Sequence, residues 1–322
     1  MVDVYLPMMK AAAIISAGQL RLFEALADGP LPLSRLAEAT GASEEGIGHL
    51  ATFLVAVGYL DHGETGYSNA AHATRWFTGR GEVDYTAGLL WTAESWGLMG
   101  GLTEAVRRGA PAQTLWTSMQ EQPHWGPVFS GYMHAFARHL GPDLLERVVL
   151  PGGALRLLDL GGSHGLHSVG FCRRHPELEA VIVDLPSALT RTEAMLAREG
   201  LSSRVTVRPG DLLHGDWGDG YDVVLYLSVA HNQTAEDNAR VLAQVGRVLR
   251  PGGLLVIHEY LTGARHDVYD AAFRLTLLTE TATRTYSQEE FAGWLAAAGF
   301  EPAQRIDLAP RQKGSLLLAR RP

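Results

Sequence analysis

The chain has 322 residues, of which 46% are apolar and 19% are charged, and it contains one cysteine. This size and composition predict a globular protein, most simply of two domains, and the single cysteine excludes a disulfide framework within the chain. We expect a cytoplasmic protein without a nucleic-acid or membrane partner. The net charge is −8, basic residues form no block, and no apolar run reaches the ~18 residues of a membrane span.

Residues 1–84 predict a helical domain. The first helical pattern, AAAIISAGQLRLFEALADG, ends in Gly29, and two more helical patterns follow before residue 60. Ser34 and Ser43 are expected to cap these helices, because a serine hydroxyl accepts a hydrogen bond from a free amide of the first turn. The polar turn LDHGETGYSNA then joins two short extended pieces. Three helices followed by a small hairpin are typical of a winged helix.

A winged helix can bind DNA, so a regulator that senses a ligand is an alternative function. Its third helix would have to enter the major groove. The exposed face of that predicted helix offers Glu44, Glu45 and His49, without arginine or lysine. Because such a face repels phosphate, we expect this domain to pack against protein rather than against DNA.

Residues 85–150 predict a helical segment that connects the two halves of the chain. In residues 151–322, short apolar runs alternate with amphipathic segments. The runs are ALRLLDL, EAVIVDL, RVTVRP, DVVLYLSV and GLLVIHEY, and helical patterns cover residues 165–175, 187–199, 235–249 and 287–299. Near-continuous Val, Ile and Leu strands alternating with helices predict an α/β domain with a parallel sheet covered on both faces. AQRIDLA and GSLLLAR are expected to close the sheet as a hairpin.

The first predicted strand runs directly into the glycine-rich loop DLGGSHG and then into a helix. Gly161, Gly162 and Gly165 allow the backbone to turn tightly and to approach a ligand closely. Their spacing differs from the dinucleotide pattern GxGxxG. Asp159, directly before the glycines, suits a cationic group and would repel a pyrophosphate.

Acidic residues follow three successive predicted strands. Besides Asp159, Asp184 closes the second strand and Asp211 follows the third. Open α/β sheets bind ligands at the carboxyl ends of their strands, so the three acids are expected to line one site. An acid at the end of the second strand commonly holds ribose hydroxyls, and Asp211 is placed to reach an adenine amine.

The stretches LLDLGGSHG, VIVDLP, GDLL, AHNQ and LRPGGLLVIHE resemble the class I S-adenosylmethionine-dependent O-methyltransferases that include caffeic acid O-methyltransferase and bacterial natural-product enzymes. The resemblance covers nearly the whole chain. It implies a Rossmann-like domain, an N-terminal winged-helix-like dimerisation domain and a homodimer. It also implies S-adenosylmethionine as cofactor, S-adenosylhomocysteine as its product, and no metal. The implied cofactor contacts are Asp159, Gly161, Gly162, Gly165, Asp184, Leu185, Asp211, Leu212 and Ser228.

His231 and Glu259 are the candidate catalytic pair. They lie at or near the carboxyl ends of the fourth and fifth predicted strands, which are side by side if the strands are adjacent. Histidine suits proton abstraction near neutral pH, and a carboxylate on its second nitrogen fixes the tautomer. By resemblance, His231 is the general base for a small, aromatic hydroxyl acceptor and Glu259 is its orienting acid.

The chain departs from the family pattern at two places beside this pair. His-Asn-Gln stands where the family has His-Asp-Trp, and Thr285 occupies the position of a second orienting glutamate. N-methylation, S-methylation and a non-methylating reaction on the same scaffold therefore stay open. The same resemblance predicts an acceptor pocket between the segment 125–140 and the sheet, lined by Phe129, Met133, His134, Asn232, Phe273 and Leu277.

Overall fold

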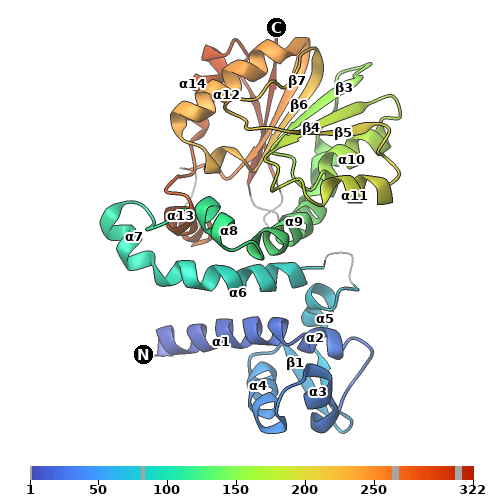
Figure 1. Ribbon diagram of the computed structural model, residues 1–322, viewed down its shortest axis with the longest axis vertical. Helices are drawn as coiled ribbons and strands as arrows, with labels where there is room; N and C mark the ends of the chain where they lie inside the picture. Colours follow the sequence, from blue (N-terminus) through green and yellow to red (C-terminus); the bar gives the residue numbers. More distant parts are fainter. Residues whose placement is uncertain (1, 81–83, 263–267, 309–313) are drawn as a thin grey trace. The chain divides into compact units, whose positions relative to one another are not determined.

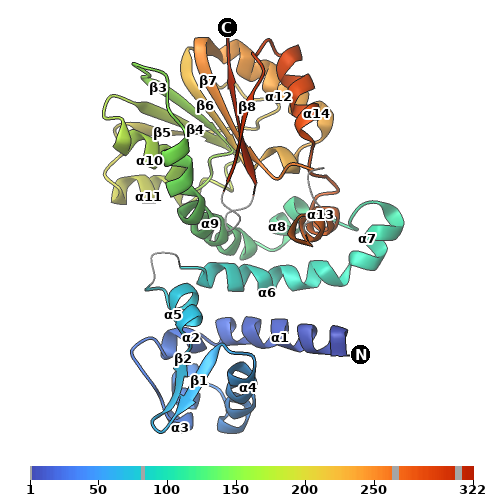
Figure 2. The same ribbon diagram turned by 180° about the vertical axis from the view of Figure 1, so that it is seen from behind.

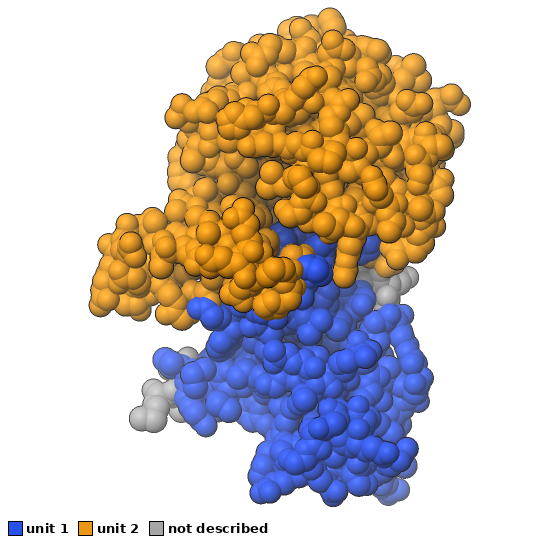
Figure 3. Space-filling model, in the orientation of Figure 1, with its two compact units in different colours: residues 1–97, 127–136 blue, residues 98–126, 137–322 orange. Residues whose placement is uncertain are grey.

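The computed structural model describes residues 2–80, 84–262, 268–308 and 314–322 (Figures 1 and 2). The chain splits into two compact units (Figure 3). Unit 1 comprises residues 1–97 and 127–136, and unit 2 comprises residues 98–126 and 137–322. The predicted division of the chain into domains at residues 84 and 150 stays a prediction.

Unit 1 is built from helices and one antiparallel hairpin, in the predicted order. Its elements are α1 (Val2–Gln19), α2 (Leu22–Ala25), α3 (Leu33–Thr40), α4 (Glu44–Ala56), β1 (Leu60–Gly63), β2 (Gly66–Asn69) and α5 (Ala71–Phe77), with most of α6 (Thr86–Gly100). The core of this unit is formed by apolar side chains of α1 to α4, among them Phe23, Leu36 and Leu54. Its segments therefore share one hydrophobic cluster.

Two local predictions in unit 1 are corrected. The helical pattern expected to run to Gly29 is interrupted, because Arg21 adopts a left-handed conformation (φ 55°) and separates α1 from α2. Ser43 caps α4 as expected, with its hydroxyl accepting a hydrogen bond from the amide of Gly46 at 3.1 Å. Ser34 does not cap α3, because that helix already begins at Leu33 with Pro32 as its N-cap residue.

Unit 2 contains a seven-stranded sheet flanked by helices. The strand order is β5-β4-β3-β6-β7-β9-β8, in which β3 to β7 are parallel and β9 is antiparallel to both neighbours. The strands are β3 (Arg156–Leu160), β4 (Glu179–Asp184), β5 (Val205–Pro209), β6 (Tyr221–Leu227), β7 (Leu249–Glu259), β8 (Gln304–Asp307) and β9 (Ser315–Arg320). The predicted parallel sheet and its closing hairpin are confirmed.

The helices of unit 2 also follow the prediction, with one shorter than expected. They are α7 (Leu102–Arg108), α8 (Leu115–Glu121), α9 (Trp125–Arg147, shared with unit 1), α10 (Leu166–Arg174), α11 (Thr192–Arg198), α12 (Ala235–Val248), α13 (Val268–Glu280) and α14 (Gln288–Ala297). The helix expected over residues 187–199 begins only at Thr192. Turns precede it, in which the Ala188 amide donates to the Leu185 carbonyl and the Leu189 amide to the Pro186 carbonyl.

Helices cover both faces of the sheet. Leu158, Tyr226 and Ile257 form one hydrophobic cluster with side chains of α12 and α14, including Val241 and Phe291. On β4 the neighbours of Ile182 belong to that cluster, so Ile182 points to the other face. There the Ile182 and Met195 side chains both border Gly165, which places α11 on that face. The carboxyl ends of β3 to β7, here called the carboxyl rim, are left for polar residues.

The strand order changes direction beside β3, which has β4 on one side and β6 on the other. At such a point the loops after neighbouring strands diverge, and open α/β sheets bind ligands in the crevice between them. The loop after β3 is the glycine-rich stretch predicted to hold the cofactor. Among the described residues, no helix is both long enough and apolar enough to cross a membrane.

Candidate active site

The loop after β3 needs its glycines for two different reasons. Gly161 and Gly165 have φ values of 72° and 71°, in the left-handed region that side chains disfavour. A Cβ on Gly162 would lie 2.6 Å from the Asp159 carboxyl carbon, and a Cβ on Gly161 would lie 2.5 Å from a methyl group of Val229. The loop therefore packs tightly on β3 beneath it and on the chain that follows β6.

Asp159 lies under this loop rather than on its surface. Its side chain is 1% exposed and accepts a hydrogen bond from the Ser168 hydroxyl at 2.7 Å. Burial raises the pKa of Asp159 to about 7, against the effect of the Ser168 hydrogen bond. The geometry gives Asp159 a role in supporting the loop, and its predicted contact with the cofactor stays a prediction.

Asp184 connects the end of β4 to the glycine loop. Its carboxylate accepts hydrogen bonds from the amide of Ser163 at 2.9 Å and from the amide of Leu185 at 2.7 Å. Burial raises the pKa of Asp184 to about 6, although both amide hydrogen bonds act in the other direction. The residue is only partly buried, and the neighbouring Leu185 side chain is exposed. Asp184 thus brings a carboxylate to the carboxyl rim.

Asp211 follows β5 at the same rim and is exposed. It accepts hydrogen bonds from the Leu213 amide at 2.8 Å and contacts the His214 ring nitrogen Nδ1 at 3.0 Å. These hydrogen bonds, led by that of Leu213, lower its pKa. Leu212, predicted to contact the cofactor, is buried and belongs to the core of unit 2. Asp159 thus lies near the end of β3, Asp184 ends β4 and Asp211 follows β5, but only Asp184 and Asp211 reach the surface.

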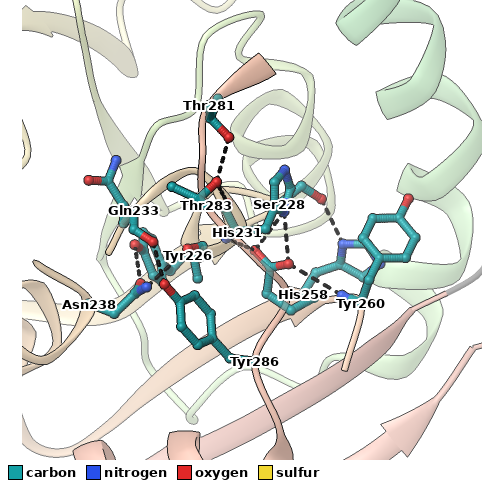
Figure 4. A network of polar contacts seen from close by, with 12 residues as sticks. Tyr226, Ser228, His231, Gln233, Asn238, His258, Tyr260, Thr281, Thr283 and Tyr286 are labelled. Atoms are coloured by element: carbon teal, nitrogen blue, oxygen red, sulfur yellow. Dashed lines mark hydrogen bonds and ion pairs between the residues drawn. The ribbon is translucent and has the colours of Figure 1, made fainter. Parts of the chain in front are cut away.

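His231 and Glu259 are in direct contact, as expected for residues that follow neighbouring strands. His231 lies in a short 3-10 helix (Ala230–Asn232) after β6, and Glu259 ends β7. The His231 nitrogen Nδ1 lies 2.9 Å and 3.1 Å from the two carboxylate oxygens of Glu259 (Figure 4). Both residues are buried. Burial by itself would raise the pKa of Glu259, but the charge and hydrogen bonds of His231 hold it below its ordinary value.

Aromatic and apolar side chains surround the His231 ring. The Phe273 ring of α13 stands edge-on with its centroid 5.1 Å from that of His231, and the Tyr260 ring centroid lies at 6.3 Å. Leu277, one turn further along α13, is buried. Phe273, predicted from a weak pattern to line the acceptor pocket, thus lies against the candidate base.

A buried polar network holds the turn that carries His231 (Figure 4). The Asn238 amide donates to the Ala230 carbonyl at 2.9 Å and to the Thr234 carbonyl at 3.1 Å, and it accepts from the Tyr226 hydroxyl at 2.9 Å. The Tyr286 hydroxyl donates to the Gln233 carbonyl at 2.6 Å. The backbone on both sides of His231 is therefore fixed by side chains of other elements.

Replacing Asn238 by alanine is expected to lower the free energy of unfolding by about 1–3 kcal/mol, because it leaves the buried Tyr226 hydroxyl without its partner and removes the side-chain bond to the Ala230 carbonyl, which keeps the backbone amide of Gln233. Urea unfolding followed by circular dichroism measures this change. Gln304→Ala, at an exposed position of β8, is the matched control and is expected to change stability by less than about 0.5 kcal/mol. An effect of Asn238→Ala as small as that of the control would contradict the role of the network.

Two buried histidines near the carboxyl rim were not predicted from the sequence. His258 lies one residue before Glu259, and its Nδ1 is 2.8 Å from the hydroxyl of Ser228, a predicted cofactor contact with a φ of 58°. His167 lies in α10, and burial, together with His258, lowers its pKa to about 3. Neither position shows a pattern in the sequence, because each histidine stands within an otherwise ordinary strand or helix.

The remaining predicted acceptor contacts fall in both units. Phe129, Met133 and His134 lie on the part of α9 that belongs to unit 1, where the Phe129 ring packs 4.9 Å from that of Trp91. Asn232 is half-buried, and its backbone N–H donates to the Val229 carbonyl at 2.9 Å. The roles of these residues in an acceptor pocket stay predictions.

Thr285, at the expected position of a second orienting glutamate, is 1% exposed. Its hydroxyl makes no hydrogen bond to the described residues. A buried threonine carries no charge, so the position cannot act on His231 as a carboxylate would.

Comparison with known proteins identifies the family. Residues 102–301 match the O-methyltransferase domain, and residues 3–79 match the O-methyltransferase dimerisation domain. The chain is 28% identical over 314 residues to the 3-hydroxy-5-methyl-1-naphthoate 3-O-methyltransferase of Streptomyces sahachiroi, covering 95% of this chain and 90% of that protein. It is 26% identical over 311 residues to an N,N-dimethyltransferase of Streptomyces rimosus, covering 92% and 90%.

The fold agrees with solved methyltransferase structures. Human N-acetylserotonin methyltransferase, solved with S-adenosylmethionine, superposes with a TM-score of 0.89 at 20% identity, covering 99% of this chain and 96% of that chain. The predicted Rossmann-like methyltransferase fold with an N-terminal dimerisation domain is confirmed. The O-methyltransferase domain alone matches more than half of this chain. The chain therefore belongs to the O-methyltransferase family and is a methyltransferase.

Proposed function

We propose that the protein transfers a methyl group from S-adenosylmethionine to a hydroxyl of a small aromatic acceptor, with His231 as the general base. The observation that carries this proposal is the buried contact of His231 Nδ1 with both carboxylate oxygens of Glu259 at the carboxyl rim. The contact orients one ring nitrogen and leaves the other, Nε2, available for a proton.

The residues around the glycine loop suit S-adenosylmethionine. Gly161 and Gly165 keep side chains away from the turn where the chain passes from β3 into α10. Asp184 brings a partly exposed carboxylate to the rim as an acceptor for ribose hydroxyls, and the exposed Asp211 is proposed to accept from the adenine amine. When bound, the cofactor supplies an electrophilic sulfonium methyl group.

The chemistry of the pair follows from its surroundings. A phenol has a pKa near ~10, so its attack at neutral pH is helped when a base removes the proton. Glu259 accepts the Nδ1 hydrogen of His231, which fixes the tautomer with a free lone pair on Nε2. As Nε2 takes the proton of the acceptor, the Glu259 carboxylate stabilises the imidazolium. Because both side chains are buried, water screens this attraction weakly.

We propose that an aromatic acceptor contacts Phe273 and Leu277 of α13, because Phe273 already stands against the His231 ring. Asn232, beside the base in the same unit, is proposed to contact the acceptor as well. The name of the Streptomyces sahachiroi relative, which acts on a hydroxynaphthoate, supports an aromatic hydroxyl as acceptor class.

The experiment that tests the function combines binding and transfer. The full chain is mixed with S-adenosylmethionine carrying a deuterated methyl group and with hydroxynaphthoates, simple phenols and the matching aromatic amines. Mass spectrometry then detects the labelled methyl group. Transfer to a hydroxyl supports the proposal. Failure to bind S-adenosylmethionine in calorimetry would refute it.

Methylation of an amine is the second candidate. The N,N-dimethyltransferase of Streptomyces rimosus is a relative over most of the chain, and Thr285 offers no second carboxylate to the base. A neutral amine needs no deprotonation before it attacks. Labelled methyl on the amines alone, retained in His231→Ala, would therefore favour this reaction over the first.

We further propose that the protein is a homodimer. Residues 3–79 match the family's dimerisation domain, and α1 carries exposed apolar side chains, among them Tyr5, Leu6 and Met8. Such a row is expected to be covered by protein. Light scattering after size-exclusion chromatography is expected to give about twice the chain mass of 34.9 kDa, and the mass of a single chain would contradict the proposal.

A further inference from the structure

Glu280 lies on the helix face that approaches His231. It is the last residue of α13, and it follows Phe273 by seven residues and Leu277 by three. Residues at these spacings share one face of a helix. On this face, the Phe273 ring contacts that of His231 and Leu277 is buried. The Glu280 carboxyl group therefore starts from the side of α13 that faces the candidate base.

The chain after Glu280 returns to His231 at once. The hydroxyl groups of Thr281 and Thr283 lie 2.5 Å apart, and the Thr283 hydroxyl donates to the His231 carbonyl at 2.5 Å (Figure 4). Glu280 is thus enclosed between two contacts with His231, the Phe273 ring before it and the Thr283 hydroxyl after it. This double attachment fixes the position of its backbone relative to the base.

The Glu280 carboxyl group is partly buried and makes no hydrogen bond to the described residues. Burial raises its pKa to about 7, and the charge of His231 acts in the opposite direction. The other titratable residues next to His231 in the described elements are Glu259, bonded to Nδ1, and Tyr260, whose ring centroid lies 6.3 Å from that of His231. Glu280 is the acid of this set that has no hydrogen bond to satisfy its charge.

We propose that Glu280 is a positioning residue that acts through His231, as a second carboxylate that stabilises the charged imidazole ring when it takes up a proton. This inference rests on the proposed function of His231. In this role Glu280 supplies, from α13, the second negative charge near His231 that the uncharged, buried Thr285 does not provide. Glu259 orients the ring by a direct hydrogen bond, whereas Glu280 acts by charge from the neighbouring helix.

The coupling is measured first without any acceptor, on the Glu280 carboxyl group itself. The full chain is labelled with 13C at the glutamate side-chain carboxyl, and the Glu280 signal is identified by its loss in Glu280→Gln. In the wild type we expect the signal to titrate with a pKa of about 7. In His231→Gln we expect this pKa to rise by roughly 0.5 or more, because the interaction with His231 that opposes the effect of burial on Glu280 is lost.

The matched control is His49→Gln, at an exposed position of α4, which is expected to leave the Glu280 titration unchanged. A Glu280 pKa that is the same in the wild type and in His231→Gln would overturn the inference. The thermal unfolding of each variant is recorded first. If His231→Gln does not fold, the wild-type titration in the presence of S-adenosylmethionine decides, and an ordinary pKa near ~4.3 overturns the inference.

Methyl transfer provides the second readout. With a hydroxylated acceptor in hand, Glu280→Gln is expected to lower kcat by about 3-fold to 10-fold without raising KM, and Glu280→Asp to retain more of the rate. The pH at which kcat of Glu280→Gln falls on the acid side is expected to be lower than in the wild type, because the imidazolium loses a stabilising negative charge. A purely structural role would not produce this shift. Glu236→Gln, an exposed change on α12, is the control. Full activity of Glu280→Gln beside an inactive His231→Gln would refute the role of Glu280 and leave the proposed function intact.

Discussion

Replacing His231 by alanine is expected to lower kcat for methyl transfer to a phenolic hydroxyl by about 100-fold to 10,000-fold. The variant keeps the glycine loop and Asp184, so its affinity for S-adenosylmethionine is expected to stay within about 2-fold of the wild type. What it loses is the nitrogen Nε2, which in the wild type is held in place by the bond between Nδ1 and Glu259. Initial rates by mass spectrometry at saturating substrate, together with calorimetry of the cofactor, measure the two quantities.

A change of acceptor separates proton removal from other effects of this substitution. A nitrophenol that is already ionised at pH 8 needs no base, so His231→Ala is expected to lose much less activity with it than with an unsubstituted phenol. His49→Ala, at an exposed position of α4, serves as the control for the loss of a histidine. Equal losses for the ionised and the neutral acceptor would contradict the role of His231 as a general base.

Replacing Asp184 by asparagine is expected to weaken S-adenosylmethionine binding by about 100-fold. In the proposed complex its carboxylate accepts from ribose hydroxyls, and such charge-assisted hydrogen bonds are about twice as strong as neutral ones. The same carboxylate accepts from the Ser163 amide, so the change also loosens the link between β4 and the glycine loop. Calorimetric titration measures the loss. Asp219→Asn, at an exposed position of the same unit, is expected to bind like the wild type.

The affinity of the wild type is also expected to depend on pH. Because burial raises the pKa of Asp184 to about 6, the free protein protonates this residue as the pH falls through 6. A neutral carboxyl group accepts more weakly than a carboxylate, so the contribution of Asp184 to binding is expected to weaken below pH 6 and to level off above pH 7. Asp159, with a pKa of about 7, contributes its own change, which remains in Asp184→Asn. An identical pH dependence in wild type and variant would exclude Asp184 from the site.

The parallel sheet could be predicted because its strands are continuous apolar runs, which periodicity and flanking glycines separate from the helices. Local conformations that depend on a single residue could not. The left-handed Arg21 divides a helical pattern that looks continuous, and the N-cap at Pro32 moves the start of α3 ahead of Ser34. Both are decided by packing within unit 1, which the pattern of one segment does not contain.

The candidate site was predictable where its residues follow consecutive strands. His231 and Glu259 could be paired because β6 and β7 are neighbours. The burial of Asp159 could not be foreseen, because a strand-end acid is compatible with either side of the loop. Glu280 follows His231 by 49 residues in the sequence and lies on a helix, so its place near the base becomes visible only in the folded chain. Residues on the strands were therefore easier to find than those on α13.

The contact between Gly161 and Val229 limits how this enzyme can diverge. A Cβ at residue 161 would meet the Val229 side chain at 2.5 Å, and Val229 stands two residues before His231. Any larger residue selected there to recognise a different cofactor would push on the turn that carries the base. Cofactor preference and reaction chemistry are thus not independent traits at this position. A new cofactor specificity is expected to be more accessible through Asp211, the proposed adenine contact, because its exposed side chain bonds to its sequence neighbours Leu213 and His214 rather than to the turn that carries His231.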